Sequence, residues 1–345
     1  MKRLLFSIVA GVMSAMMVSA ADGIDYDGTK LSLNTEFTRS ECGTMYKSVM
    51  PETSGFACSR QTPGFIWAHG DENTGSNKKI VAIKPNGDLA MTVKIGSGDA
   101  GRDDWEDIAT GVYAGKNYVF IGAFGDNDLA FKDKYYIYYF EEPAITSGTK
   151  TIDVNYVCFG YPDNKAHNTE TLMYDNVEHV FYIADKVKDG VCTLFSLVFD
   201  PSKGTSLQTL TKVCELGNGS KFNFLTGGDI SPDGRWMLIK SKKHALLWER
   251  QGNESLSETA QRRPVQIAAY EAETQGEAVA WLDNSTFYTT SDDKSNVPIY
   301  QYVRSMPQDI ENLPSSDNGV RKILHDGQVL IVRGDKTYTL QGQEE

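Results

Sequence analysis

Acidic residues that recur at matching places along the chain are the strongest chemical signal in this sequence. Glu106, Glu170 and Glu277 stand near the start of similar short segments, with Asp229 one step from this place in a fourth segment and Ser54 in the first. If these side chains met, two carboxylates about 6 Å apart would repel by about 3 kcal/mol at an effective dielectric constant of about 20. Such a group needs a bound cation, a proton, or separation by water.

The donor types indicate which cation could bind. Carboxylate and amide oxygens suit Ca²⁺ or Mg²⁺ rather than zinc, and these two ions are the predicted cofactors. The predicted metal ligands are Glu106, Glu170, Glu277, Asp126 and Asn127. The predicted polar pocket around them also contains His69, Asp71, Asp104, Asp107, Lys186, Asp229 and Lys240.

Two alternatives to a metal site stay open from the residues alone. Lys186 and Lys240 reach the same rim and could neutralise the acids internally, because structural ion pairs also cluster carboxylates. His69 follows a buried run, where a capping hydrogen bond is one role and general-base catalysis is another.

Short strands must position these residues, since β-branched and aromatic runs bounded by Gly, Asn, Asp and Pro recur along the chain. The most regular runs start at residues 65, 118, 180, 236 and 286, which are 53, 62, 56 and 50 residues apart. A shorter segment precedes each run, and a further strand follows it. Four repeats also have a predicted fourth strand, at residues 89–95, 151–157, 207–213 and 265–269. This spacing is typical of β-propeller blades, whose first strands line a common channel.

The predicted fold is therefore all-β, with a β-propeller of five four-stranded blades over residues 21–304. The fifth repeat lacks its last strand, and we expect Lys30–Thr35 to fill that place and close the ring. Residues 305–317 have the composition of a linker. Residues 318–345 predict a short C-terminal β tail of three strands, about half the length of a sixth blade.

Residues 1–20 predict a cleavable signal peptide. Lys2 and Arg3 precede a mostly apolar stretch, and Val18-Ser19-Ala20 supplies the small residues of a cleavage site. The stretch is shorter than the roughly 20 residues of a membrane span. We therefore predict no membrane span and an exported protein, either periplasmic, at the cell surface or extracellular.

Net charge limits the classes of binding partner, and the cysteine content allows disulfides. The net charge of −12 becomes −14 once Lys2 and Arg3 are removed, because residues 1–20 contain no acid. An acidic chain repels phosphate backbones, so we expect no nucleic-acid partner. Five cysteines are present, and the pairs Cys192 with Cys214 and Cys42 with Cys58 could form disulfides, although sequence does not fix connectivity.

The motifs resemble those of a family of secreted bacterial β-propellers of largely unassigned function. The matching segments are WAHGD (67–71), DWEDIA (104–109), GDN (125–127), EEP (141–143), ADK (184–186), TGGDISPDG (226–234) and QGEA (275–278). The sequence departs from the family pattern at Ala123, where a second acid is expected, and at Gly70, where Asn is usual. The arrangement is more distantly similar to phytase-like and gluconolactonase-like propellers, which implies a divalent metal in the central channel.

Two functions are compatible with these residues. The first is a binding or scaffold module for a glycan, a small polar ligand or a protein, because propellers present shaped loops on a rigid frame. The alternative is a metal-assisted hydrolase of a phosphoester, lactone or other polar small molecule, in which a cation activates water. No nucleophile motif or phosphate-binding loop is present, which favours the first.

Overall fold

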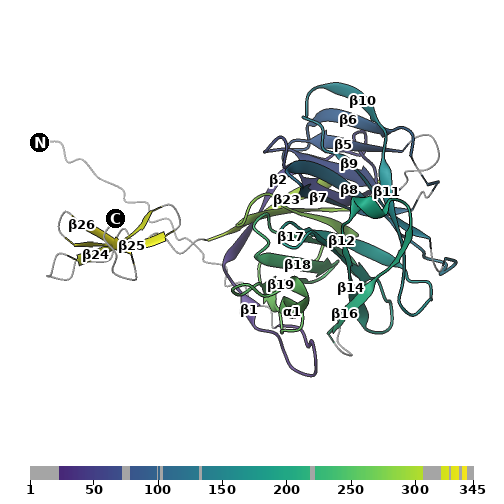
Figure 1. The fold of residues 1–345 in the computed structure, drawn as a ribbon. Coiled ribbons are helices and arrows are strands. Elements are labelled where there is room, and N and C mark those ends of the chain that lie inside the picture. The colour runs from purple at the N-terminus through teal and green to yellow at the C-terminus, as the bar shows by residue number, and fades with distance from the viewer. Residues whose placement is uncertain are drawn as a thin grey trace, which may run out of the picture.

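The computed structural model describes residues 23–71, 78–98, 100–101, 104–131, 134–217, 222–305, 320–325, 328–333 and 336–339. The predicted signal peptide and nearly all of the predicted linker lie outside these residues. The described strands form a five-bladed β-propeller, as predicted (Figure 1). Within the described residues, no helix is long and apolar enough to cross a membrane.

Each blade is a sheet whose first strand is innermost. Blade one consists of β3 (Thr53–Cys58), β4 (Ile66–Gly70), β5 (Lys79–Ile83) and β6 (Leu89–Ile95). Blade two consists of β7 (Trp105–Tyr113), β8 (Lys116–Ala123), β9 (Tyr135–Glu141) and β11 (Asn155–Gly160). Blade three consists of β12 (Thr169–Asp175), β13 (Val180–Asp185), β14 (Cys192–Val198) and β16 (Thr211–Leu216). Blade four consists of β17 (Leu225–Ile230), β18 (Trp236–Ser241), β19 (Ala245–Glu249) and β20 (Val265–Ile267). Blade five consists of β21 (Gly276–Trp281), β22 (Thr286–Ser291), β23 (Val297–Arg304) and β2 (Phe37–Met45). The inner strands contact one another in the closed order β3, β7, β12, β17, β21, β3.

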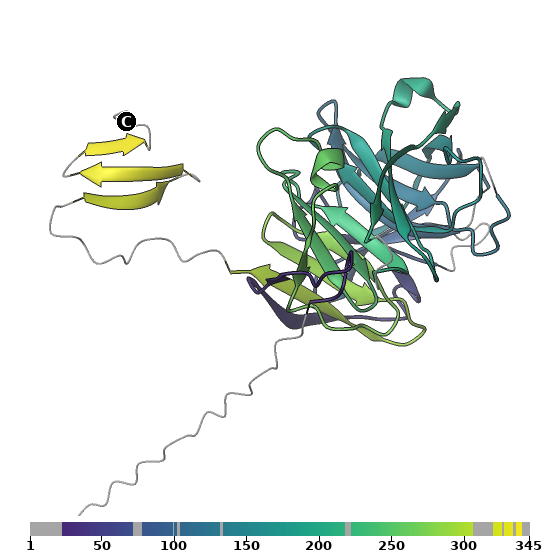
Figure 2. The same ribbon diagram turned by 90° about the horizontal axis from the view of Figure 1, so that it is seen from below.

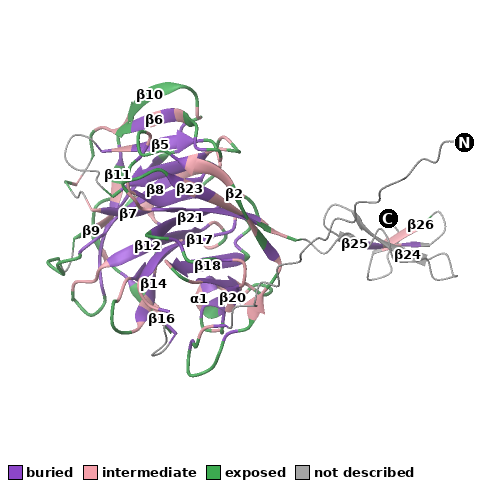
Figure 3. Ribbon diagram, turned by 180° about the vertical axis from the view of Figure 1, so that it is seen from behind, coloured by how far each residue is buried: buried purple, intermediate pink, exposed green. Residues whose placement is uncertain are grey.

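The described apolar core consists of five clusters, one between each pair of neighbouring blades. Strand β18 shows how alternation produces this arrangement. Trp236 and Leu238 pack toward blade five, whereas Met237 and Ile239 pack toward blade three. Both faces of the strand are thus covered, which is why the blade strands appear as continuous apolar runs and are coloured as buried in Figure 3.

The prediction of an N-terminal closing strand is confirmed, but the predicted segment is wrong. Strand β2 pairs antiparallel with β23 and completes blade five. The expected segment supplies β1 (Leu33–Asn34), which pairs in parallel with β20 and adds a fifth strand to blade four. The closing strand was missed because it is an edge strand whose residues are mostly half-buried or exposed, so polar residues interrupt its apolar pattern.

Two predicted fourth strands are each divided between neighbouring blades. The segment 151–157 spans β10 (Gly148–Ile152), which pairs in parallel with β6 of blade one, and β11, which belongs to blade two. The segment 207–213 likewise spans β15 (Leu207–Thr209), paired with β11, and β16 of blade three. In both places the chain first adds a short strand to the preceding blade and then enters the next strand of its own blade. The local sequence gives no signal for this change of blade.

The C-terminal strands lie where the sequence predicts them. Strands β24 (Val320–His325), β25 (Gln328–Arg333) and β26 (Lys336–Thr339) form an antiparallel sheet of their own, drawn in yellow in Figure 2.

The five cysteines are free thiols, so neither candidate disulfide is formed. Cys192 lies opposite Leu216, and Cys214 lies opposite Leu194, on adjacent strands but not facing each other.

Candidate functional site

A β-bulge lies at the start of every inner strand, at matching positions in the five blades. Register shifts occur between Thr53 and Gly55, Trp105 and Asp107, Thr169 and Thr171, Leu225 and Gly227, and Gly276 and Val279. The extra residues within these bulges include Ser54, Glu106, Glu170, Thr226 and Glu277. Bulges turn a side chain out of the regular strand pattern, and here the equivalence predicted for the three glutamates holds. Thr226, not Asp229, is the matching residue of blade four.

A second set of residues follows directly after the second strand of each blade. These residues are Asp71, Phe124, Lys186, Lys242 and Asp292. The bulge residues and the residues after the second strands, Phe124 excepted, thus supply most of the polar groups of the candidate site, and Asp104 before β7 adds another. We call Asp71, Asp104, Glu106, Glu170, Glu277 and Asp292 the axial acidic cluster.

Three members of this cluster lie close enough to share one ligand. One carboxylate oxygen from each of Asp71, Asp104 and Glu106 lies within 4.8 Å of the other two. Gly125, which follows β8, makes this approach possible, because a Cβ there would overlap the Glu106 carboxylate and lie 2.5 Å from the Asp104 Cγ. Glu106 is buried, Asp104 is half-buried and Asp71 is exposed, so the triad leads from the interior to solvent.

Two lysines pair with acids of the cluster that lie outside this triad. Lys186 forms an ion pair with Glu170, and the Lys242 Nζ lies 3.5 Å from Glu277 Oε1. This corrects the predicted internal neutralisation, because Lys242 takes the rim place expected for Lys240.

Among the described residues, these lysines form ion pairs with Glu170 and Glu277, two of the six acids of the cluster. Burial, followed by repulsion from Glu170, Asp104 and Asp71, raises the pKa of Glu106 well above its usual range. Burial also raises the pKa of Glu170 to about 8, although the Lys186 ammonium opposes the shift. Partial desolvation of the carboxyl group, together with nearby acids, raises the pKa of Asp71 to about 6 and that of Asp292 to about 7. Protons or a bound cation would offset the repulsion between these carboxylates near neutral pH.

Asp107 and Asp229 have a different role, which is to join neighbouring inner strands. The Asp107 carboxylate accepts hydrogen bonds from Ile108 N at 2.9 Å and, across the blade boundary, from Leu172 N at 2.8 Å. Asp229 does the same with the backbone N–H groups of Ile230 at 2.8 Å and Trp281 at 2.7 Å. Their oxygens are engaged by backbone donors, so we assign both residues to the fold.

The two polar residues of the GDN motif, unlike its glycine, lie outside the close triad. Asp126 accepts hydrogen bonds from Ala130 N, Phe131 N and the Tyr135 hydroxyl, at 2.8 to 2.9 Å, and so fixes its own loop. Asn127 Oδ1 accepts from Asn168 Nδ2 at 3.1 Å. The residues with metal-ligating geometry are Glu106, Asp71 and Asp104. The sequence placed Asp71 and Asp104 only in the surrounding pocket.

His69 and Lys240 are both fully buried rather than on the rim. His69 lies within β4, where burial lowers its pKa to about 4, and Nδ1 is 3.3 Å from Gly70 O. Burial lowers the pKa of Lys240 to about 8, and its Nζ lies 5.8 Å from the Tyr270 ring centre. His69 Nε2 and Lys240 Nζ have no hydrogen-bond partner among the described residues. Because His69 is neutral and enclosed, it is poorly placed as a general base.

A cavity of about 480 Å³ lies beside the cluster, and sequence reasoning missed it. Its walls include Asn127 after β8, His167 and Asn168 before β12, Lys186 after β13, and Phe224 before β17. Lys186 also contacts Glu170, so this cavity adjoins the axial acidic cluster. Its walls come from three blades, which is why no local pattern indicated it.

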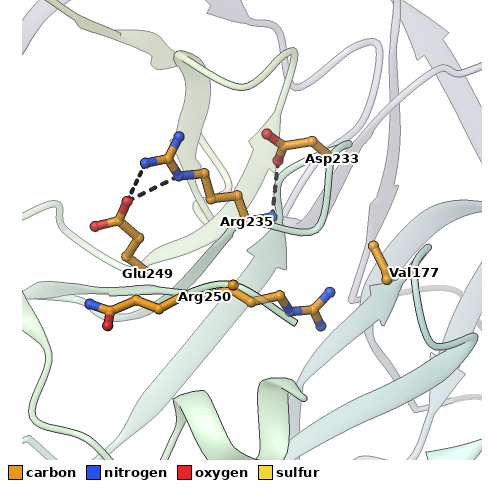
Figure 4. Close-up of a pocket in the computed structure, with 7 residues that line it drawn as sticks. Val177, Asp233, Arg235, Glu249 and Arg250 are labelled. Atoms are coloured by element: carbon orange, nitrogen blue, oxygen red, sulfur yellow. Dashed lines mark hydrogen bonds and ion pairs between the residues drawn. The ribbon is translucent and has the colours of Figure 1, made fainter. Parts of the chain in front are cut away.

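Another cavity, of about 580 Å³, lies beside the β18–β19 hairpin (Figure 4). Arg235 turns toward Glu249, and Arg250 extends toward Val177. The Arg235 Nε lies 3.0 Å from Glu249 Oε1, and Arg250 pairs with Asp175 and Glu178. Both arginines of this cavity are already paired with acids, so we do not assign a ligand to it.

Comparison with known proteins does not assign a family. No family model matches the chain, and no curated protein matches it. One similar solved structure is described as a gluconolactonase from Xanthomonas campestris that is important in glucose secondary metabolism. It has 11% sequence identity and a TM-score of 0.40, and the match covers 73% of this chain and 72% of the other. We transfer no residue role or activity from a likeness of this size.

Proposed function

We propose that this protein is an exported binding module that holds a divalent cation, Ca²⁺ or Mg²⁺, on the propeller axis and binds a small polar ligand beside it. The observation that carries the proposal is the Asp71–Asp104–Glu106 triad, whose oxygens lie within 4.8 Å of one another. Oxygens bound at 2.3–2.6 Å on opposite sides of Ca²⁺ are about 5 Å apart. One ion could therefore contact all three carboxylates.

Electrostatics supports a cation at this place. Carboxylates about 5 Å apart repel by about 3 kcal/mol per pair at an effective dielectric constant of about 20. The two rim lysines lie against Glu170 and Glu277 rather than within the triad. A divalent ion could replace the protons that the raised pKa values of Glu106 and Asp71 imply. An all-oxygen donor set favours Ca²⁺ or Mg²⁺ over zinc.

The graded burial of the triad supports ligand binding through the ion. Glu106 holds the buried side, whereas Asp71 is exposed. Ca²⁺ accepts six to eight oxygens, so three protein carboxylates leave coordination places for water or for ligand oxygens. A buried ion enclosed on all sides would not offer such places.

Calorimetric titration of the chelator-treated mature protein with CaCl₂ and MgCl₂ tests the proposal. We expect one ion per chain and a higher melting temperature with the ion present. Glu106→Gln should abolish the heat, because an amide supplies less negative charge to the ion. Glu249→Gln, which changes an acid in the cavity of Figure 4, should bind as the parent does. Absence of heat and of any thermal shift in the parent protein would refute the cation site.

Hydrolysis remains the second candidate because one observation favours it. Glu170 combines a pKa of about 8 with a Lys186 partner, so it could exchange a proton near neutral pH beside a cation. Assays of phosphoester, lactone and carboxylester substrates with added Ca²⁺ or Mg²⁺ test this. Turnover that Glu170→Gln abolishes would establish hydrolysis, whereas turnover unaffected by Glu106→Gln and Glu170→Gln would exclude this mechanism.

A further inference from the structure

The cavity beside the axial acidic cluster has walls that are fixed before any ligand arrives. The His167 ring lies between two carboxylates, with Nδ1 3.0 Å from Asp185 and Nε2 3.2 Å from Asp163. Its ring also stacks on Tyr161, with centres 4.1 Å apart. Carboxylates on both sides raise the pKa of His167 despite its burial. A wall held in this way loses little conformational freedom on binding.

An amide pair fixes the neighbouring wall. Asn168 accepts a hydrogen bond from Asp126 N at 2.9 Å and donates one to Asn127 Oδ1 at 3.1 Å. Both amide orientations follow from this network. Because Oδ1 of Asn127 is already an acceptor, its Nδ2 group is the donor that Asn127 can offer a ligand.

Phe224 forms another wall and has an unusual backbone. Its φ of 59° lies in the left-handed region, which is uncommon for a bulky residue. Its N–H donates to Val187 O at 3.1 Å, and its ring centre lies 4.8 Å from Lys186 Nζ. Backbone strain of this kind persists where the surroundings fix it, and it clusters at ligand-binding places.

The chemistry of the walls points to an uncharged ligand. His167 is paired with two acids and Lys186 with Glu170, so these charges largely compensate one another. Lys188, the other lysine of the walls, is exposed, so water solvates its charge. What remains is an amide donor beside apolar surface from Phe224 and Leu129. Pockets that combine apolar walls with a few fixed polar groups suit small ligands. A sugar ring matches this pattern because it presents hydroxyl groups beside C–H faces.

We infer that this cavity binds a neutral carbohydrate, whose hydroxyl groups contact the Asn127 amide while its C–H face packs on the wall formed by Phe224 and Leu129. The inference rests on the proposed binding function and adds the chemical class of the ligand. The contact between Lys186 and Glu170 places the cavity beside the axial acidic cluster, which also contains the proposed cation ligands. The cavity walls themselves include no member of the axial acidic cluster.

A glycan array tests the inference, followed by titration with the best neutral oligosaccharide found. The array carries neutral di- to tetrasaccharides of glucose, galactose, mannose and N-acetylglucosamine beside uronate-containing oligosaccharides of equal length. We expect neutral sugars to bind, with affinity at least about tenfold lower in Phe224→Ala and Asn127→Ala. Tyr46→Ala, which changes an exposed aromatic residue on another blade, should bind sugar as the parent does.

Calcium titration of the same variants separates this inference from the proposed function. Phe224→Ala should lose sugar binding but retain the calcium heat, whereas Glu106→Gln should lose the calcium heat. An unchanged melting temperature shows that each variant is folded, and Phe224→Tyr should keep sugar affinity if Phe224→Ala proves unstable. The inference is overturned if no neutral sugar binds with or without calcium, if only uronates bind, or if both cavity variants bind as the parent does.

Discussion

Gly125 lies directly against Glu106, and this contact sets the size of the proposed cation site. A Cβ at Gly125 would overlap Glu106 Oε1 and approach the Asp104 carboxylate as well. The constraint is one of space, since Gly125 is not among the glycines with positive φ. The glycine of the GDN motif thus serves the acidic triad, whereas its two polar residues serve the neighbouring loop and cavity.

We expect Gly125→Ala to lower calcium affinity by at least about tenfold, because one methyl group must push Glu106 and Asp104 away from Asp71. Calorimetry measures the change. In a Glu106→Gln background the same substitution should have no further effect on calcium binding. Equal affinity in Gly125→Ala and the parent would show that the triad does not hold the ion.

Stability in the presence of a chelator should fall as pH rises from 6.5 to 8. The folded-state pKa values of Glu170 (about 8) and Asp292 (about 7) are raised above the unfolded values. Such acids contribute stability that is complete at low pH and is lost as pH rises through the folded pKa. His69, with a lowered pKa of about 4, acts in the opposite direction, but only below about pH 6.5.

Scanning calorimetry at pH 6.5 and 8, with EDTA and with CaCl₂, measures this dependence. Calcium should reduce the loss of melting temperature at pH 8, because the ion replaces the protons. A melting temperature that rises over this interval in EDTA would contradict the assignment of raised pKa values to the cluster.

Asp229→Ala should destabilise the fold without changing calcium affinity. The substitution leaves the buried N–H groups of Ile230 and Trp281 without their acceptor. Each unsatisfied group costs about 1–3 kcal/mol, so the melting temperature should fall by at least about 5 °C. Asp229→Asn keeps one acceptor oxygen and should be less severe. Loss of calcium binding in the still-folded variants would move Asp229 into the site.

Removal of the closing strand should be far more harmful than removal of the segment before it. A chain that starts at residue 36 loses β1 but keeps β2 on blade five, so it should still unfold cooperatively at a lower temperature. A chain that starts at residue 46 exposes the edge of β23, and we expect aggregation or loss of the cooperative transition. Circular dichroism and light scattering compare the two. Similar behaviour of both chains would contradict closure by β2.

Sequence periodicity was sufficient to predict the five inner strands and the equivalence of Glu106, Glu170 and Glu277. The signal was strong because each blade strand is buried on both faces and a bulge recurs at the same place. Edge strands gave a weaker signal. This explains the wrong closing segment and the two fourth strands that are divided between blades.

The close ligand set could not be derived from repeats. Asp104 precedes an inner strand and Asp71 follows a second strand, so the two acids occupy different places in their blades and meet only across a blade boundary. The cavity could not be derived from repeats either, because its walls come from three blades. The sequence by itself determined the blades and the acids of their inner strands, because local alternation and burial leave a periodic pattern. Tertiary structure alone decided which acids touch and which are used by the backbone, because those distances depend on how neighbouring blades pack around the axis.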